Sequence, residues 1–181
     1  MRTLGFAWGI VGVLLLLSFA IFRLAPIAFE LGDLQLSAVH WASLAFSVVY
    51  MAYAEGYKGF HRGFSPRVIQ RANYLRENPR WHHVLLAPAF CMGYIYATRR
   101  RQILSIGLTL VVMGFVVVAR QLPQPWRGIL DAGVVTGLSL GIMSILYFLL
   151  NSLRTPGFIT VSPEVPLPTA IGTDAAVQPD A

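Results

Sequence analysis

Charge is scarce in this sequence, and cysteine is almost absent. Only 12% of the 181 residues are charged and 56% are apolar, whereas roughly a quarter of residues are charged in soluble domains. The single cysteine, Cys91, excludes an internal disulfide and any site built from several cysteine ligands. With a mean hydropathy of +0.62, the composition predicts a protein whose solvent is the lipid bilayer.

Motifs for nucleotide, redox and metal chemistry are also missing. The chain has no Walker loop, no dinucleotide fingerprint, no CxxC pair and no paired acids at catalytic spacing. The four histidines His40, His61, His82 and His83 match no ligand spacing that would indicate a metal. The sequence therefore predicts no cofactor and no metal, and it argues against ATPase, flavin and redox roles.

Long uncharged runs alternate with short polar connections. A transmembrane helix needs about 20 apolar residues to cross the hydrocarbon core, and four runs approach that length: 4–22, 36–54, 103–119 and 128–150. The first run predicts a retained anchor rather than a cleaved signal peptide, because it is long and no Ala-x-Ala site follows it. The predicted fold is an all-α, polytopic membrane helix bundle over residues 1–153.

Residues 84–97 leave the number of spans open. This uncharged run has 14 residues and is interrupted by Pro88, which favours a re-entrant segment. Extended to residues 81–98 it could just cross a bilayer as a fifth span. With four spans, eleven of the 14 Lys and Arg lie on one side, against nine with five spans. The positive-inside rule thus favours four spans plus a re-entrant segment, which also makes the C-terminal tail cytoplasmic.

The longest polar stretch, residues 55–83, carries six Lys and Arg and is predicted to be cytoplasmic with either number of spans. Ser65 as N-cap and Pro66 at the first helical position predict a helix that ends at Asn78. Arginines beside an apolar arc are typical of a short helix lying in the membrane interface, and the alternative is a loop helix packed on the bundle. The interfacial arrangement predicts that lipid phosphates contact Arg62, Arg67, Arg71 and Arg76. Anionic phospholipid is therefore an expected partner, and nucleic acid is not.

Asp131 lies within a predicted span, and such residues are functional hypotheses by default. Arg127 precedes it by four residues on the same helical face, within reach of an intramembrane ion pair. A structural role near the helix start competes with a role in proton or ion translocation. Translocation usually needs further intramembrane acids, and the sequence shows none, because Glu55 is predicted to end the second span paired with Lys58.

Glycines recur at every fourth position in two of the predicted spans. Gly133, Gly137 and Gly141 form two overlapping GxxxG steps, and Gly5 and Gly9 repeat the spacing in the first span. This spacing places the glycines on one face, where another helix can approach closely. The partner helix belongs to the same bundle, to a second copy of the chain or to another membrane protein.

The sequence favours a non-catalytic accessory or assembly component that acts through helix packing and anionic-lipid contact. One alternative is a transporter or channel subunit that uses Asp131, and another is a membrane-embedded enzyme. For an enzyme, Ser139 completes a G-x-S-x-G pattern, but a mid-helix serine lacks the strand-to-helix turn that the motif needs. Residues 154–181 are rich in proline and predict a disordered tail. We expect an integral protein of a bacterial inner (plasma) membrane with a cytoplasmic N-terminus.

Overall fold

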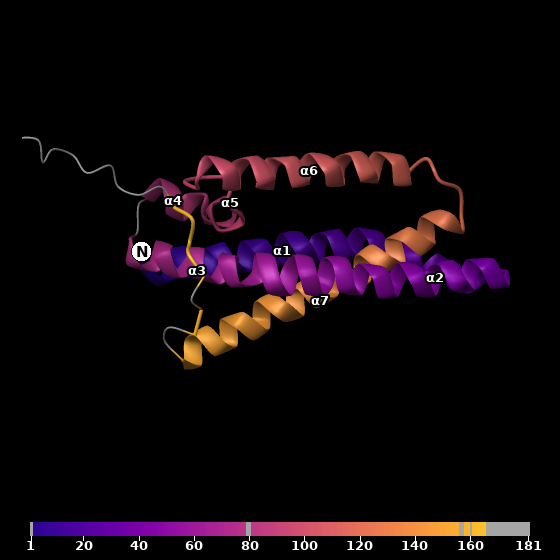
Figure 1. Cartoon of the computed structure of the whole chain (residues 1–181), viewed down its shortest axis with the longest axis horizontal. Coiled ribbons are helices and arrows are strands. Elements are labelled where there is room, and N and C mark those ends of the chain that lie inside the picture. Colours follow the sequence, from indigo (N-terminus) through magenta and orange to yellow (C-terminus); the bar gives the residue numbers. More distant parts are fainter. Residues whose placement is uncertain (1, 79–80, 156–157, 160, 166–181) are drawn as a thin grey trace, which may run out of the picture.

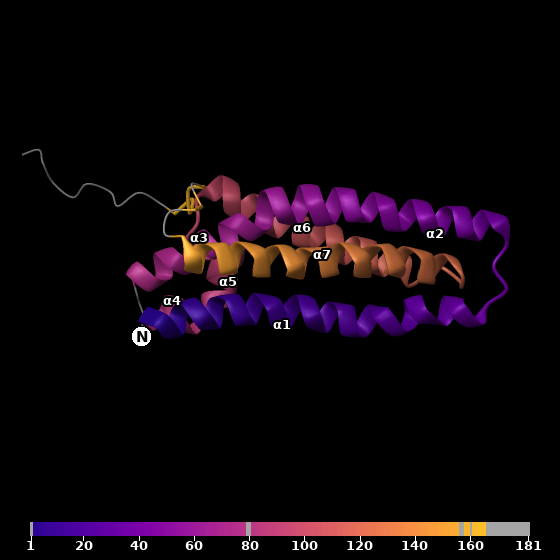
Figure 2. The ribbon, with the colours of Figure 1, turned by 90° about the horizontal axis from the view of Figure 1, so that it is seen from below.

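The computed structural model describes residues 2–78, 81–155, 158–159 and 161–165, and every regular element in these ranges is helical. Four long helical segments run alongside one another (Figures 1 and 2). They are α1 (Arg2–Phe29), the segment made of α2 (Ala38–Met51), η2 (Ala52–Phe64) and α3 (Ser65–Glu77), and then α6 (Arg99–Ala119) and α7 (Trp126–Arg154). The predicted all-α class is confirmed.

Three helices are long and apolar enough to cross a membrane, which is compatible with a membrane protein. They are Thr3–Asp33, formed by α1 and the short η1 (Glu30–Asp33), followed by α6 and α7. α1 and α7 are longer than the predicted runs 4–22 and 128–150, because a helix can continue beyond the hydrocarbon and place its charged ends in water.

α7 is the helix around which the others are arranged. Figure 2 shows α7 between α1 and α2, and it packs against both of them. α1 and α2 are consecutive in the chain and run in opposite directions. α7, which comes later in the chain, lies between them. The order of helices in space thus differs from their order in the sequence.

α3 runs from Ser65 to Glu77 and ends at Asn78, as predicted, but Ser65 is not its N-cap, because the helical winding is continuous from Ala38 to Glu77. Between Ala52 and Phe64 the chain is wound as a π-helix, whose backbone bonds join residues five apart. The N–H of Ser65 accordingly donates to the carbonyl of Phe60. Pro66 has no N–H to donate and crowds a regular α-helix, so the wider winding just before it lets the helix continue.

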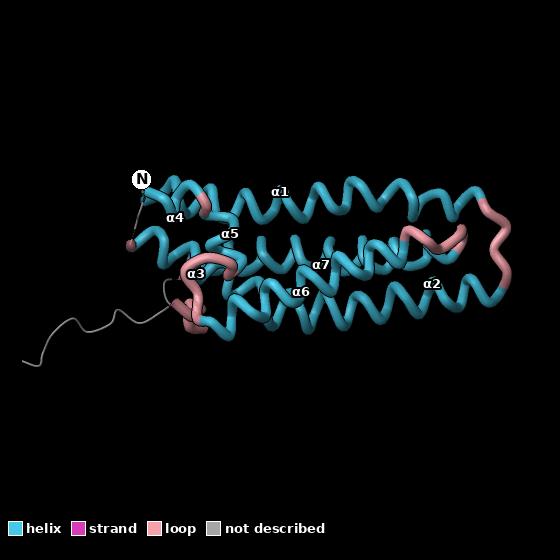
Figure 3. Tube along the Cα trace, turned by 90° about the horizontal axis from the view of Figure 1, so that it is seen from above, coloured by secondary structure: helices cyan, strands magenta, loops and turns pink. Residues whose placement is uncertain are grey.

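The segment with the ambiguous prediction, residues 84–97, forms no long helix. It contributes to α4 (Trp81–Leu85) and α5 (Ala87–Met92), which have five and six residues. Both lie at the end of the bundle that also holds the N-terminus, α3 and the start of α6 (Figures 1 and 3). The chain therefore enters and leaves this segment at one end, and Gly93 turns it after α5 with a φ of 85°.

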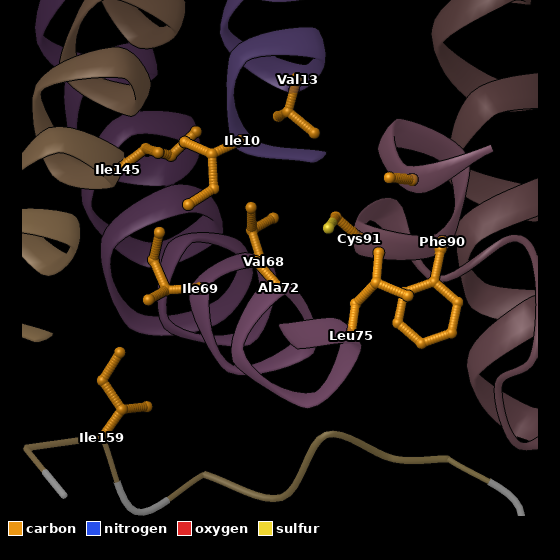
Figure 4. Close-up of a cluster of buried hydrophobic side chains, with 11 residues drawn as sticks. Ile10, Val13, Val68, Ile69, Ala72, Leu75, Phe90, Cys91, Ile145 and Ile159 are labelled. Carbon is orange, nitrogen blue, oxygen red and sulfur yellow. The ribbon is translucent and has the colours of Figure 1, made fainter. Parts of the chain in front are cut away.

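The hydrophobic core is concentrated at this end of the molecule (Figure 4). α3 is central to it, because seven of its 13 residues are buried. The alternative of a helix packed on the bundle therefore describes α3, whose apolar arc faces the protein core. The core residues come from α1, α3, α5, α7 and the segment after α7: Ile10, Val13, Val68, Ile69, Ala72, Leu75, Ala87, Phe90, Cys91, Ile145 and Ile159.

Part of the predicted disordered tail is packed onto the same end. Ile159 is buried in the core, and the carbonyl of Glu164 accepts a hydrogen bond of 3.0 Å from the N–H of Thr98. Within 154–181, the prediction is thus wrong for the described positions up to residue 165. Residues 166–181 lie outside the described part of the chain.

Candidate functional site

A cavity of about 500 Å³ lies between α6 and the face formed by α1, α2, η2 and α7. α6 packs loosely, since most of its residues are exposed and Figure 1 shows it set apart from the other long helices. Beyond its polar first turn, its side chains are mostly apolar on every face, as expected of a helix surrounded largely by lipid. α6 therefore forms a loosely packed wall of the cavity.

The cavity wall is apolar apart from five charged side chains. Leu24 of α1, Phe115 of α6 and Leu138 of α7 are among the apolar lining residues. The charged ones come from four parts of the chain: Arg23 of α1, Glu55 of η2, Arg120 after α6, and Arg127 and Asp131 of α7. Apolar walls with a few charged groups are typical of a ligand site, because the charges fix the orientation of what binds.

All three arginines at the end remote from the N-terminus line this cavity. Arg23 lies in the last two turns of α1, Arg120 follows α6 directly, and Arg127 lies in the first turn of α7. In the described part of the chain no other Lys or Arg belongs to this end. Its basic charge is thus concentrated at one mouth of the cavity, where it favours an anionic group.

Asp131 is buried beside these arginines, with 5% of its surface exposed. Its Oδ2 atom lies 3.8 Å from Nε of Arg127, so the ion pair predicted from the sequence is present. The same Oδ2 atom accepts no hydrogen bond from the part of the chain that the structure describes. A buried carboxylate oxygen without a donor can accept one from a bound ligand.

Glu55 lies deeper in the bundle than the sequence suggested. The predicted ion pair with Lys58 is absent among the described residues, since the π-helical winding changes which residues share a face. A Cβ atom placed on Gly137 would instead be 2.7 Å from Oε2 of Glu55, so this carboxylate lies against the middle of α7. Gly137 follows Asp131 by six residues, which is about 9 Å along the helix axis. The cavity thus holds two acids at different depths.

The three glycines of α7 lie along one contact with the second helical segment. A Cβ atom on Gly133 would be 3.0 Å from the carbonyl oxygen of Ser47, and one on Gly141 would be 2.7 Å from the ring of Phe60. With Gly137 against Glu55, these glycines form a seam, and the partner helix belongs to the same chain. The sequence did not predict a site at Glu55. The glycine spacing of α7 is the signal that could have indicated a close neighbour there, because a glycine face allows another helix to approach.

The glycines of α1 are also in contact within the chain. A Cβ atom on Gly5 would be 3.1 Å from Val84, and one on Gly9 would be 2.7 Å from the sulfur of Cys91. The α1 spacing therefore accommodates α4 and α5, which the sequence had left as an ambiguous membrane segment. Close packing at these glycines holds that segment against α1.

Arg71 was predicted to contact lipid phosphate, but in the structure its side chain is buried in the protein. It is 2% exposed, and its guanidinium donates to the carbonyls of Phe90 at 2.6 Å, Pro163 at 2.7 Å and Ile95 at 2.8 Å. Burial lowers the pKa of Arg71 to about 10, which still leaves it charged at neutral pH. Arg71 therefore ties α5, the following loop and the tail to α3. Arg62 and Arg76 are exposed and remain candidates for lipid contact.

The groups considered for catalysis do not assemble into a reaction site. Ser139 donates back to the carbonyl of Val135 at 2.7 Å, as a serine inside a helix normally does. His61 instead lies 3.1 Å from the hydroxyl of Ser144, which is buried at 5% exposure and joins η2 to α7. Among the described residues, no three His, Cys, Asp or Glu side chains lie close enough together to bind a metal ion.

No family model, curated protein or solved structure matches this chain. The charged cavity is the feature from which its function is inferred. It combines a basic mouth, two acids and long apolar walls. Such a site can bind and orient a molecule that has a charged head and an apolar body.

Proposed function

We propose that this protein is a four-span integral membrane protein that binds an anionic phospholipid in the cavity beside α6, as a non-catalytic accessory component. α2 with the first part of η2 supplies the fourth span, while α4 and α5 stay at one side. In the described part of the chain, ten Lys and Arg lie on the side of the proposed spans that holds the N-terminus, against three on the other side, which favours a cytoplasmic location for that end. The membrane is then a bacterial inner membrane.

The arginine-lined mouth is the observation that carries this proposal. Arg23, Arg120 and Arg127 would hold the phosphate of a lipid through charge-assisted hydrogen bonds, which are stronger than neutral ones. The acyl chain would lie along apolar residues such as Leu24 and Phe115, where it replaces lipid that would otherwise contact α6. Contacts between the acyl chain and the cavity wall replace similar contacts with other lipids, so they add little to the binding free energy. The headgroup therefore determines selectivity.

The test measures lipid selectivity of the full chain in a non-ionic detergent. Native mass spectrometry or thermal stability is followed while phosphatidylglycerol or phosphatidylcholine with identical acyl chains is added. We expect phosphatidylglycerol to bind more tightly, and the double variant Arg23→Gln/Arg120→Gln to lose roughly tenfold in affinity or more, since a hydrogen bond to a charged group contributes about 1.5–3 kcal/mol. Arg127 is left intact because it pairs with Asp131.

Arg154→Gln provides the matched control, because it removes an exposed arginine at the opposite end of the bundle. This variant is expected to bind phosphatidylglycerol as the natural chain does. Equal binding of the two lipids, or unchanged binding by the double variant, would show that the cavity is not selective for an anionic headgroup. A second copy or another membrane protein seated on α6 instead of lipid would give the same negative result.

Transport is the second candidate function, favoured by one observation. Glu55 and Asp131 line the same cavity at different depths, which supplies the second intramembrane acid that the sequence did not show. Protons or cations could pass between the two carboxylates. Proteoliposomes separate the candidates: flux that Glu55→Gln and Asp131→Asn both abolish, with normal insertion, would establish transport. Absence of flux leaves lipid binding as the function.

A further inference from the structure

Two arginines and a carboxylate of the tail meet at the other end of the bundle. The carboxylate of Glu164 lies between Arg67 of α3 and Arg101 of α6. Its Oε1 atom is 3.9 Å from Nε of Arg67, and its Oε2 atom is 3.7 Å from Nε of Arg101. One carboxylate from the tail thus bridges two helices that are far apart in the sequence.

The tail carboxylate is a poor ligand for these two arginines. Both distances exceed the roughly 2.7–2.9 Å of a charge-assisted hydrogen bond. Nε of Arg67 is buried and has no hydrogen-bond partner among the residues that the structure describes. Glu164 itself has a φ of 49°, in the left-handed region that residues with a side chain rarely adopt. The tail thus brings Arg67 and Arg101 to one carboxylate and leaves the buried Nε of Arg67 without a hydrogen bond in the described part of the chain.

The position of Glu164 is fixed by its backbone. The carbonyl of Pro163 accepts from Arg71 at 2.7 Å, and the carbonyl of Glu164 accepts from the N–H of Thr98 at 3.0 Å. These bonds hold the tail over α3 and over the start of α6, where Arg99 and Arg100 are exposed. A single negative charge therefore faces several arginines, and the site remains basic with the tail in place.

We propose that Arg67 and Arg101 form a binding site for a phosphate group, and that Glu164 competes with that group for the site. Phosphate has more oxygens than a carboxylate and suits two guanidinium groups that converge from different directions. The site lies at the end of α6 that adjoins its apolar run, so the phosphate can come from a lipid headgroup or from water. Binding displaces the Glu164 side chain and loosens the tail segment 161–165.

The experiment uses the full chain in non-ionic detergent, with the Arg23→Gln/Arg120→Gln background so that the cavity beside α6 does not contribute. The probes are inorganic phosphate and, separately, phosphatidylglycerol with phosphatidylcholine as the neutral control. Glu164→Gln is expected to bind at least one phosphate probe roughly tenfold more tightly, because it removes the charged competitor. Glu77→Gln, which removes an exposed acid of α3, controls for the change in net charge.

A second set of variants tests whether the phosphate binds to Arg67 and Arg101. In the Glu164→Gln background, Arg67→Gln or Arg101→Gln should reverse the gain, while Arg76→Gln at an exposed position of α3 should not. Hydrogen exchange at residues 161–165 should increase when phosphate binds the natural tail. A response to inorganic phosphate identifies a water-borne phosphate, and a response to phosphatidylglycerol alone identifies a lipid headgroup.

The proposal is overturned if Glu164→Gln binds both probes no more tightly than Glu77→Gln. It is also overturned if the gain survives Arg67→Gln and Arg101→Gln, because the phosphate would then bind elsewhere. Both results are independent of the cavity beside α6, whose failure would appear as equal binding of the two lipids by the chain with Arg23 and Arg120 intact.

Discussion

Replacing Gly133 with alanine tests the contact between α7 and the second helical segment. The added methyl carbon would lie 3.0 Å from the carbonyl oxygen of Ser47, 3.0 Å from Cγ of Met51, and closer still to the hydroxyl of Ser47. The hydroxyl and the Met51 side chain can rotate away. The carbonyl cannot, because it belongs to the continuous helix from Ala38 to Glu77 and moves only with that helix.

The expected cost follows from this rigid contact. The two helices must separate by a few tenths of an ångström to reach ordinary contact at 3.4 Å or more. Overpacking of this kind lowers the free energy of unfolding by roughly 1–3 kcal/mol. The higher helix propensity of alanine returns up to about 1 kcal/mol. With the full offset of about 1 kcal/mol, a net loss of about 0–2 kcal/mol is expected.

Unfolding by SDS in mixed micelles, followed by circular dichroism, measures this difference. Gly114→Ala in α6 is the matched control, because a Cβ atom there meets nothing within 4 Å and the change should be neutral or slightly stabilising. If Gly133→Ala were as stable as Gly114→Ala, α7 and α2 would not be packed as described.

Three further outcomes are expected. Arg71→Met should lower the free energy of unfolding by at least about 3 kcal/mol, because buried carbonyls are left without donors, and SDS unfolding of Arg71→Lys should show only partial recovery. Burial raises the pKa of the Cys91 thiol to about 12, so a maleimide at pH 8 should label it only after denaturation; rapid labelling of the folded protein would contradict this burial. A reporter fused at Ala181 should read as cytoplasmic, and an external signal would rule out four spans.

Local regularities in the sequence were enough to predict the long helices and one ion pair. Runs of apolar residues near bilayer length gave α1, α6 and α7, because length and hydrophobicity are properties of the segment itself. The pairing of Arg127 with Asp131 depends only on the regular turn of an α-helix. These features need no information about what lies beside them in space.

Glu55 and Arg71 were misplaced because their surroundings come from distant parts of the chain. The π-helical winding and the glycine seam of α7 decide the depth of Glu55, and neither follows from the residues next to it. Arg71 is on the edge of an amphipathic arc and looked exposed, but four carbonyl groups from residues 90, 95, 96 and 163 satisfy it in the core. The packed tail was missed for the same reason, since Ile159 enters a core built by other helices.

The place of α7 between α1 and α2 has a consequence for the biogenesis of the protein. A ribosome completes α7 after the other helices that the structure describes, yet α7 carries the seam that joins α2 and η2 to the rest. Until it emerges, the first two helices lack the surface that unites them, and Glu55 has no glycine face to lie against. Insertion of the early helices and closure of the bundle are thus separate events during synthesis, and a chain stopped before Trp126 should insert but remain open to proteases.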